Sequence, residues 1–173
     1  MLSYQKGVVK TSVRHLVEFL FRSGEITTGS SVSASPEAML EGGRLHRKIQ
    51  RGQKATYQSE VPLKMEWKEE EYNLVLEGRA DGIDKTEVDR KKIVYVDEIK
   101  CVYRDVEEIE KADILHLAQA KCYAYMYGIK QDLEKIGVQI TYCHIETEQI
   151  KKIFYIFFLL LNHKYILFFL KVI

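Results

Sequence analysis

Three consecutive runs of alternating polar and apolar residues constrain the fold more than any other feature of the sequence. The first run spans Tyr57 to Trp67 and the second spans Tyr72 to Ile83, with an acidic turn at residues 69–71 between them. A period of two is typical of β-strands that bury one face, and two such runs around a short polar turn predict a hairpin. The third run, residues 93–102, follows a charged turn and extends the hairpin to a three-stranded antiparallel meander.

Helical periodicity flanks this meander on both sides. Apolar residues recur at helical spacing in residues 13–21, 35–50 and 114–126, and residues 137–145 alternate again like a strand. Ser35 before Pro36 is typical of a helix start, and Gly128 is typical of a helix end. In a chain of 173 residues, the order helix, helix, three strands, helix, strand predicts one α/β domain with a mixed central sheet flanked by helices.

The charged residues are nearly balanced in number but unevenly distributed. Lys and Arg total 26 and Asp and Glu total 25, which argues against a histone-like polycation. Residues 56–110 hold nine basic and sixteen acidic residues, whereas residues 1–55 hold nine and four, and residues 111–173 hold eight and five. An acidic centre between basic flanks fits a cation site beside a surface for a polyanion, and it also fits a few solvated hairpin loops.

The cysteine content favours a reducing compartment. Three cysteines, at positions 101, 122 and 143, are too few for a full disulfide set or for a zinc or iron–sulfur site with four thiolate ligands. Residues 1–9 lack the apolar core of a secretion signal. We therefore expect a cytoplasmic protein with buried thiols.

The last 21 residues differ in composition from the rest of the chain. Of residues 153–173, 17 are apolar, and the segment has no Gly, Ala, Ser, Thr, Asp or Glu. Residues 162–164 (Asn-His-Lys) divide it into apolar runs too short to cross a bilayer, which needs about 20 residues. We expect no stable membrane span, a domain over residues 1–152, and a tail over 153–173 that is a truncated or frame-shifted end. This tail alone supports the alternative of a small membrane-associated protein.

Three ionisable residues in neighbouring strands are the best candidates for a functional site. Glu98 and Lys100 share the strand face of Val94 and Val96, so a charged pair continues an apolar stripe. If the strand of Asp81 lies beside that of Glu98, two carboxylates and one ammonium group converge. A divalent cation would relieve the repulsion between the carboxylates, and oxygen ligands suit Mg²⁺ or Mn²⁺. The alternative is a Glu98–Lys100 pair on a partly exposed strand, with Asp81 beginning a turn.

Around these positions the sequence resembles the PD-(D/E)XK nuclease superfamily, and within it the RecB-like branch. The resemblance rests on four segments in order: Gly43–His46, Glu77–Ile83, Asp97–Lys100 and Gln119–Tyr123. They are similar to the helix that supplies a histidine, the first acidic motif, the acid-x-Lys motif and the Gln-x-x-x-Tyr motif. The resemblance implies a restriction-endonuclease-like αβββαβ core, in agreement with the element order. Up to about residue 152, the chain is similar to the N-terminal nuclease-like domain of some DinG/XPD-like bacterial helicases.

The resemblance also implies a metal site and catalytic roles. Asp81 and Glu98, with the backbone carbonyl of Ile99, would hold the divalent ion, and His46 would add a ligand or support one. Lys100 would orient the attacking water or offset charge on the phosphate. Asp81, Glu98 and Lys100 are thus the expected catalytic residues. A lone helix histidine such as His46 is otherwise more often a structural residue.

Four further polar residues lie in or near these motifs. Gln119 and Tyr123 share a helix face and would position the substrate, although ordinary amphipathic packing explains the same spacing. Glu60 matches an acidic position before the first motif, but we expect an exposed strand glutamate. Asp97 should point away from Glu98 and is excluded as a ligand.

These observations predict a metal-dependent DNA nuclease domain that acts on single-stranded or branched DNA. The resemblance places it in repair or recombination, with a helicase domain or subunit as partner. The sequence has no Walker A motif, so no ATPase activity is assigned to this chain. We expect no iron–sulfur cluster, because the fourth cysteine of that version of the branch is missing. The alternative is a non-catalytic nucleic-acid-binding or regulatory module of a helicase.

Overall fold

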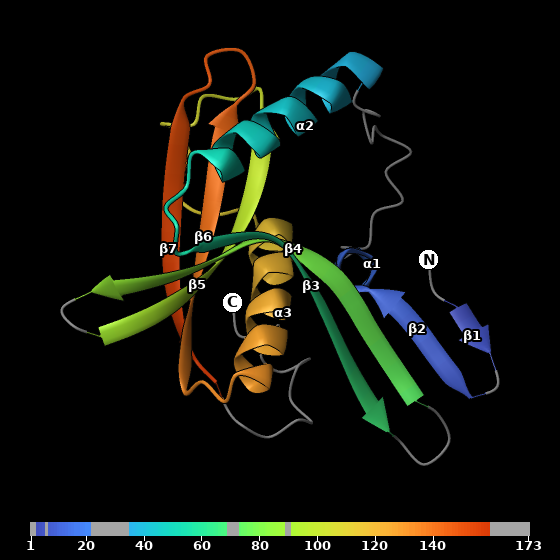
Figure 1. Cartoon of the computed structure of the whole chain (residues 1–173). Coiled ribbons are helices and arrows are strands. Elements are labelled where there is room, and N and C mark those ends of the chain that lie inside the picture. Colours follow the sequence, from blue (N-terminus) through green and yellow to red (C-terminus); the bar gives the residue numbers. More distant parts are fainter. Residues whose placement is uncertain (1–2, 6, 22–34, 69–72, 89–90, 160–173) are drawn as a thin grey trace.

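The computed structural model describes residues 3–5, 7–21, 35–68, 73–88 and 91–159. In chain order, its elements are β1 (Ser3–Gln5), β2 (Val8–Ser12), α1 (Val13–Leu20), α2 (Pro36–Arg51), β3 (Tyr57–Lys68), β4 (Asn73–Val88), β5 (Lys91–Val102), α3 (Ile114–Lys130), β6 (Lys135–His144) and β7 (Ile150–Phe158). Figure 1 shows a strongly twisted sheet, with α2 lying across one end of β5, β6 and β7.

Seven strands of the described part form one mixed sheet. The strand order is β1-β2-β4-β5-β6-β7, and β3 pairs with β4 outside this row. β2 is parallel to β4 and β5 is parallel to β6, whereas the other neighbours are antiparallel. The prediction of an α/β fold with a mixed sheet flanked by helices is therefore confirmed. The order αβββαβ is found in α2, β3, β4, β5, α3 and β6.

Helices cover both faces of the sheet. α2 begins as predicted, because Ser35 Oγ accepts a hydrogen bond from the backbone N–H of Ala38 at 3.2 Å. Its buried side chains and their strand partners form a small core of Leu45, Ile49, Ile99 and Cys143. The larger core lies on the opposite face, where α3 contacts β3, β4, β5, β6 and α1. β5 is thus covered on both faces near the predicted site.

β7 extends the sheet beyond the boundary expected after residue 152. It pairs antiparallel with β6, with one face toward the core and the other toward solvent. Ile153, Tyr155 and Phe157 pack against the core and Leu159 is buried, whereas Phe154, Ile156 and Phe158 are exposed. The expected boundary falls inside this strand, so residues 153–158 belong to the sheet. Residues 160–173 lie outside the described residues.

Among the described helices, none is long and apolar enough to cross a membrane. The longest of them, α3, has 17 residues and is buried along most of its length. Its apolar residues therefore serve the core of the domain.

β4 changes neighbours along its length, and this change creates the site. Residues 73–77 pair with β2, and residues 82–88 pair with β5, while β3 follows β4 along the other edge. The sheet forks at residues 78–81, which pair with neither β2 nor β5 (Figure 1). Asp81 lies at this fork, in the middle of a 16-residue strand, so the alternative in which Asp81 begins a turn is wrong.

Two glycines let tyrosine rings approach β4 beside the fork. The hydroxyl oxygen of Tyr123, from α3, lies 2.7 Å from the place that a Cβ atom would take on Gly78. The ring of Tyr57, from β3, occupies the corresponding place on Gly82. Any larger residue at either position would collide with a ring, so both glycines are needed for this packing.

Candidate metal and catalytic site

Asp81 is held at the fork by groups from two other elements. Its Oδ2 accepts a hydrogen bond from the backbone N–H of Ile99 at 2.7 Å and lies 3.1 Å from Nε2 of His46. Ile99 belongs to β5 and His46 to α2, so this carboxylate joins three elements. The expected proximity of the Asp81 and Glu98 strands is confirmed, because β4 and β5 pair directly.

His46, Glu60 and Asp81 form the group of described residues that could hold a metal ion. One ligand atom from each lies within 4.8 Å of the other two. Nδ1 of His46 is 3.8 Å from Oε1 of Glu60, and the three side chains are between 19% and 40% exposed. An ion from solvent can therefore reach them. Glu98, an expected ligand, is not part of this group, and the role expected for the Ile99 carbonyl stays a prediction.

Glu60 is on β3 with its side chain 40% exposed, as expected for an exposed strand glutamate, and it also lies within the group formed with His46 and Asp81. Its backbone has a φ of 56°, in the left-handed region that non-glycine residues rarely adopt. The ladder with β4 includes Ser59 and Val61 but skips Glu60 between them. Such a conformation costs of order 1–3 kcal/mol and is common at functional sites.

Gln50 links Glu60 to the fork, and no motif in the sequence indicates this role. Its Nε2 donates to Oε1 of Glu60 at 2.7 Å and to the backbone carbonyl of Asp81 at 2.9 Å. Arg79 completes the environment of Glu60, with Nε 2.7 Å from Oε2. The available signal was spacing, since Gln50 follows His46 by four residues and shares its helix face.

Glu98 is a buried carboxylate beside Lys100. Its side chain is 1% exposed, and Oε1 lies 2.7 Å from Nζ of Lys100. Apart from this ion pair, neither oxygen has a hydrogen-bond donor in the described part of the chain. Burial, followed by the negative charge of Asp81, raises the pKa of Glu98 to about 8, and Lys100 opposes this. A buried carboxylate with so few partners is unfavourable unless a further cation or donor completes its environment.

Asp97 occupies the opposite face of β5, as the period of two predicts. Thr141 Oγ1 donates to it at 2.6 Å and the Tyr57 hydroxyl donates at 3.0 Å, while Gln139 Nε2 donates to Thr141 at 2.9 Å. Desolvation raises the pKa of Asp97, and these hydrogen bonds act in the opposite direction. The network connects β3, β5 and β6 beneath the site and fixes their relative positions.

α3 brings Tyr123 and Gln119 close to the fork. Tyr123 is buried, and burial followed by the charge of Glu98 raises its pKa to about 12. Hydrogen bonds with the backbone of Arg79 and the side chain of Gln119 act in the opposite direction. The helix face predicted to point at the site does so, and its role in positioning a substrate stays a prediction.

The charge on His46 is coupled to the same carboxylate. Its hydrogen bond with Asp81 raises the pKa of His46, while burial acts in the opposite direction. A proton and a metal ion would compete for the same imidazole nitrogen. The fork thus gathers an imidazole, three carboxylates and an ammonium group, a combination suited to a divalent cation beside a bound anion.

Comparison with known proteins gives a counterpart for the fold. No protein-family model and no curated protein matches the sequence. A solved structure, "Crystal structure of SSO0001", aligns with a TM-score of 0.58 at 19% sequence identity, covering 96% of this chain and 75% of that chain. At this identity, the likeness concerns the fold alone.

Proposed function

We propose that this chain is a metal-dependent nuclease that hydrolyses phosphodiester bonds in DNA. The observation that carries the proposal is Glu98, which is 1% exposed and has only Lys100 as a described partner. A carboxylate in this setting calls for a further positive charge nearby. Asp81 on the neighbouring strand contributes to the raised pKa of Glu98, so the two carboxylates are electrostatically coupled. The motifs that resemble the PD-(D/E)XK superfamily contain these same residues.

Mg²⁺ or Mn²⁺ is the cofactor that fits these groups. His46, Glu60 and Asp81 offer ligand atoms within 4.8 Å of one another, and two of the three are carboxylates. Glu98 and the carbonyl oxygen of Ile99 would complete the set. A bound ion would polarise the scissile phosphate and lower the pKa of a water molecule.

Lys100 is the residue that we assign to the reacting phosphate. Its side chain is 26% exposed, whereas its partner Glu98 is buried. The buried carboxylate therefore fixes the ammonium group from inside the protein, and the Lys100 side chain stays partly accessible to solvent. An ammonium group has three donors, and those not used by Glu98 can orient a water molecule. They can also offset the negative charge that develops on the phosphate during attack. Gln119 and Tyr123 would position the substrate from α3.

The wider biological role rests on the resemblance. We propose single-stranded or branched DNA as the substrate, repair or recombination in the cytoplasm as the setting, and a helicase domain or subunit as the partner. A non-catalytic nucleic-acid-binding module with the same fold is the alternative. Asp81, Glu98 and Lys100 argue against it, because binding alone needs no buried carboxylate beside a lysine.

Cleavage assays on the full chain test the proposal. We expect cleavage with Mg²⁺ or Mn²⁺ and none in excess EDTA. Asp81→Ala and Lys100→Ala should both abolish cleavage, and only Asp81→Ala should also weaken Mn²⁺ binding measured by calorimetry. Lys10→Ala is the matched control, because Lys10 also pairs with a glutamate, Glu77 at 2.8 Å, but at an exposed position on β2. Cleavage that is equally fast in EDTA would exclude the metal mechanism.

A further inference from the structure

A pocket of about 500 Å³ opens beside the candidate site, between α2 and the end of β5. His46 and Lys100 line it, so it shares two residues with the site. The other side chains around it are mostly apolar and include Met39, Cys101 and Tyr103. A ligand in this pocket would therefore touch a nonpolar wall and the two polar groups of the site at once.

The rim of this pocket exposes large apolar side chains. Tyr103 is 59% exposed and Met39 is 69% exposed. An exposed aromatic ring beside a mainly apolar hollow provides a flat surface for stacking. The mostly apolar lining and the exposed Tyr103 ring suit a planar, uncharged ring.

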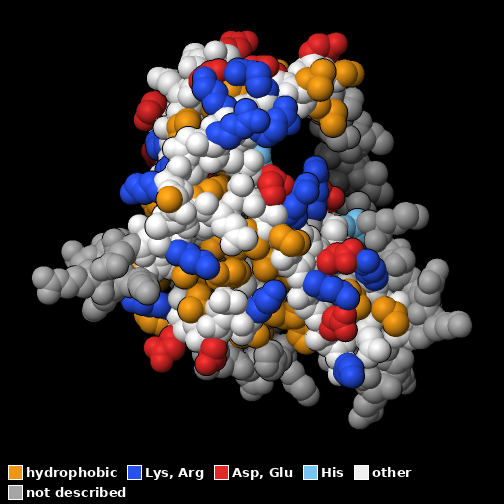
Figure 2. Space-filling view, in the orientation of Figure 1, with side chains coloured by type: hydrophobic (Ala, Val, Ile, Leu, Met, Phe, Trp, Pro, Cys, Tyr) orange, Lys and Arg blue, Asp and Glu red, His pale blue; other side chains and the backbone are white. Residues whose placement is uncertain are grey.

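The charges on α2 indicate where an anionic group would bind. Figure 2 shows Lys and Arg side chains gathered over α2, with hydrophobic side chains at its N-terminal end. Arg44 pairs with Glu41 and Glu148, and Lys48 also pairs with Glu148. Arg47 makes no ion pair with any described residue, and its Nη1 lies 3.4 Å from the place of a Cβ atom on Gly43, which lines the pocket. Arg47 does not itself line the pocket, but its exposed guanidinium lies beside the lining residue Gly43.

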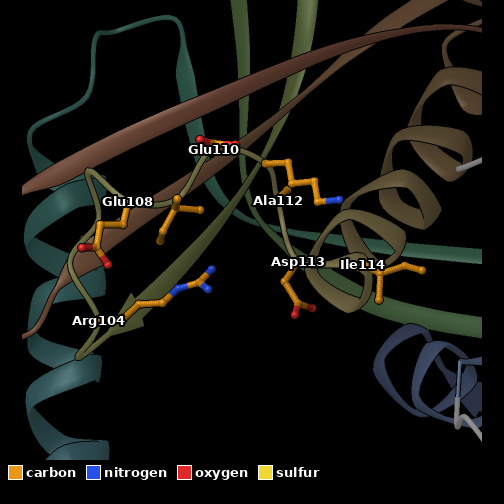
Figure 3. Close-up of a pocket in the computed structure, with 8 residues that line it drawn as sticks. Arg104, Glu108, Glu110, Ala112, Asp113 and Ile114 are labelled. Carbon is orange, nitrogen blue, oxygen red and sulfur yellow. The ribbon is translucent and has the colours of Figure 1, made fainter.

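A second pocket, of about 540 Å³, differs in charge. It lies between the end of β5 and the start of α3, where Figure 3 shows Glu108, Glu110 and Asp113 around it with Arg104 extended into it. Three carboxylates outnumber the two basic residues, Arg104 and Lys111, among its lining residues. A phosphate group is disfavoured there, whereas the basic residues of the first pocket suit one.

We infer that the pocket between α2 and β5 is a subsite for one unpaired nucleotide, an inference that rests on the proposed action on nucleic acids. The base stacks on Tyr103 and contacts Met39, and the adjoining phosphate lies between Arg47 and Lys100. A base inside a duplex is stacked and cannot enter such a pocket, so the subsite selects single-stranded segments. Tyr103 and Arg47 are thus specificity residues, distinct from those that would hold the metal.

Binding experiments in EDTA test this subsite separately from cleavage. The probes are a fluorescent ten-nucleotide oligothymidine and a duplex of the same length, titrated with the full chain by anisotropy. Tyr103→Ala should weaken binding of the single strand about tenfold, since one base–aromatic stack is lost, and should leave duplex binding unchanged. Tyr103→Trp should restore binding of the single strand. Phe158→Ala is the control, because Phe158 is 76% exposed at the other end of the sheet.

Arg47 gives an independent arm of the same experiment. Arg47→Gln should reduce the slope of log affinity against log salt by about 0.7, the value for one phosphate contact to a single strand. Arg44→Gln is its control on the same helix and should change the slope less, because Glu41 and Glu148 already neutralise Arg44. The subsite is refuted if the wild type does not bind the single strand, or if Tyr103→Ala weakens both probes equally. Tight binding without cleavage in Mg²⁺ would refute only the proposed nuclease activity.

Discussion

Phe157 on β7 provides the sharpest test of the fold, because it lies in the segment whose composition suggests a foreign tail. Its side chain packs against the large core and stacks with Tyr155, with ring centroids 6.3 Å apart. The ammonium group of Lys121 lies 4.8 Å from the centroid of the Phe157 ring. Phe158, the next residue, is 76% exposed. Two adjacent phenylalanines therefore form an internal comparison.

The expected cost of Phe157→Ala follows from these contacts. Removing a fully buried phenylalanine costs about 3–5 kcal/mol of unfolding free energy. Phe157 is only partly buried, so we expect about 2 kcal/mol, with the contact to Lys121 included. In a chain of 150–250 residues, each kcal/mol lowers the Tm by about 2–4 °C, which gives a decrease of about 4–8 °C. Phe158→Ala should change stability by less than about 0.5 kcal/mol.

Thermal unfolding followed by circular dichroism measures this difference. Phe157→Ala should melt clearly below the wild type. Phe158→Ala should melt at the same temperature as the wild type. Truncation after residue 159 should retain a cooperative transition, whereas truncation after residue 152 should not, because it removes the β7 residues that cover β6. Unchanged melting of both Phe157→Ala and the chain truncated after residue 152 would refute the packing of β7 and support a boundary after residue 152.

Two further predictions concern a buried charge and a close approach. Lys121 is 1% exposed, and burial lowers its pKa to about 8 from an ordinary value near 10.5. The unfolded chain therefore binds this proton more tightly than the folded chain. The free energy of unfolding should rise as the pH increases from 8 to 10.5. Lys121→Met should be about 1–3 kcal/mol more stable than the wild type at pH 7. In urea titrations at pH 8 and pH 10.5, its stability should not rise with pH as that of the wild type does. The same rise in both proteins would contradict this prediction. Gly82→Ala would drive a methyl group into the ring of Tyr57 and should cost about 1–3 kcal/mol. Gly52→Ala is its control in the same urea titrations, because Gly52 has a φ of −80° and ordinary contacts at 3.6 Å, and equal effects of the two changes would exclude the close approach.

The central elements could be predicted because their signals are local. The N-cap of α2, the hairpin of β3 and β4, and the helical period of α3 each depend on residues close in sequence. β1 and β2 could not be predicted, since they have three and five residues and β2 pairs with β4, some 65 residues further along the chain. β7 was missed because both of its faces are apolar, which removes the alternation that identifies a strand.

The candidate site was predictable where strand geometry determines it. The pairing of β4 with β5 brings Asp81 and Glu98 close, and the period of two separates Glu98 from Asp97. Glu60 could not be found this way, because its position in the site depends on a positive φ that no residue type at that position indicates. The fork of the sheet also has no local signal, since it arises from the separate pairing of β4 with β2 and β5.

The two consecutive carboxylates of β5 show how the strand separates support from chemistry. Asp97 and Glu98 are both almost fully buried, on opposite faces. Asp97 accepts hydrogen bonds from Thr141 and Tyr57, so its charge is satisfied and serves to connect strands. Glu98 has the same burial but, among the described residues, only Lys100 as an ion-pair partner and no hydrogen-bond donor, so it retains capacity for a further partner. The hydrogen bonds of Asp97 join β5 to β3 and β6 and so fix the position of β5. Asp97 takes no part in the proposed chemistry, but it determines where Glu98, on the other face of β5, lies at the fork.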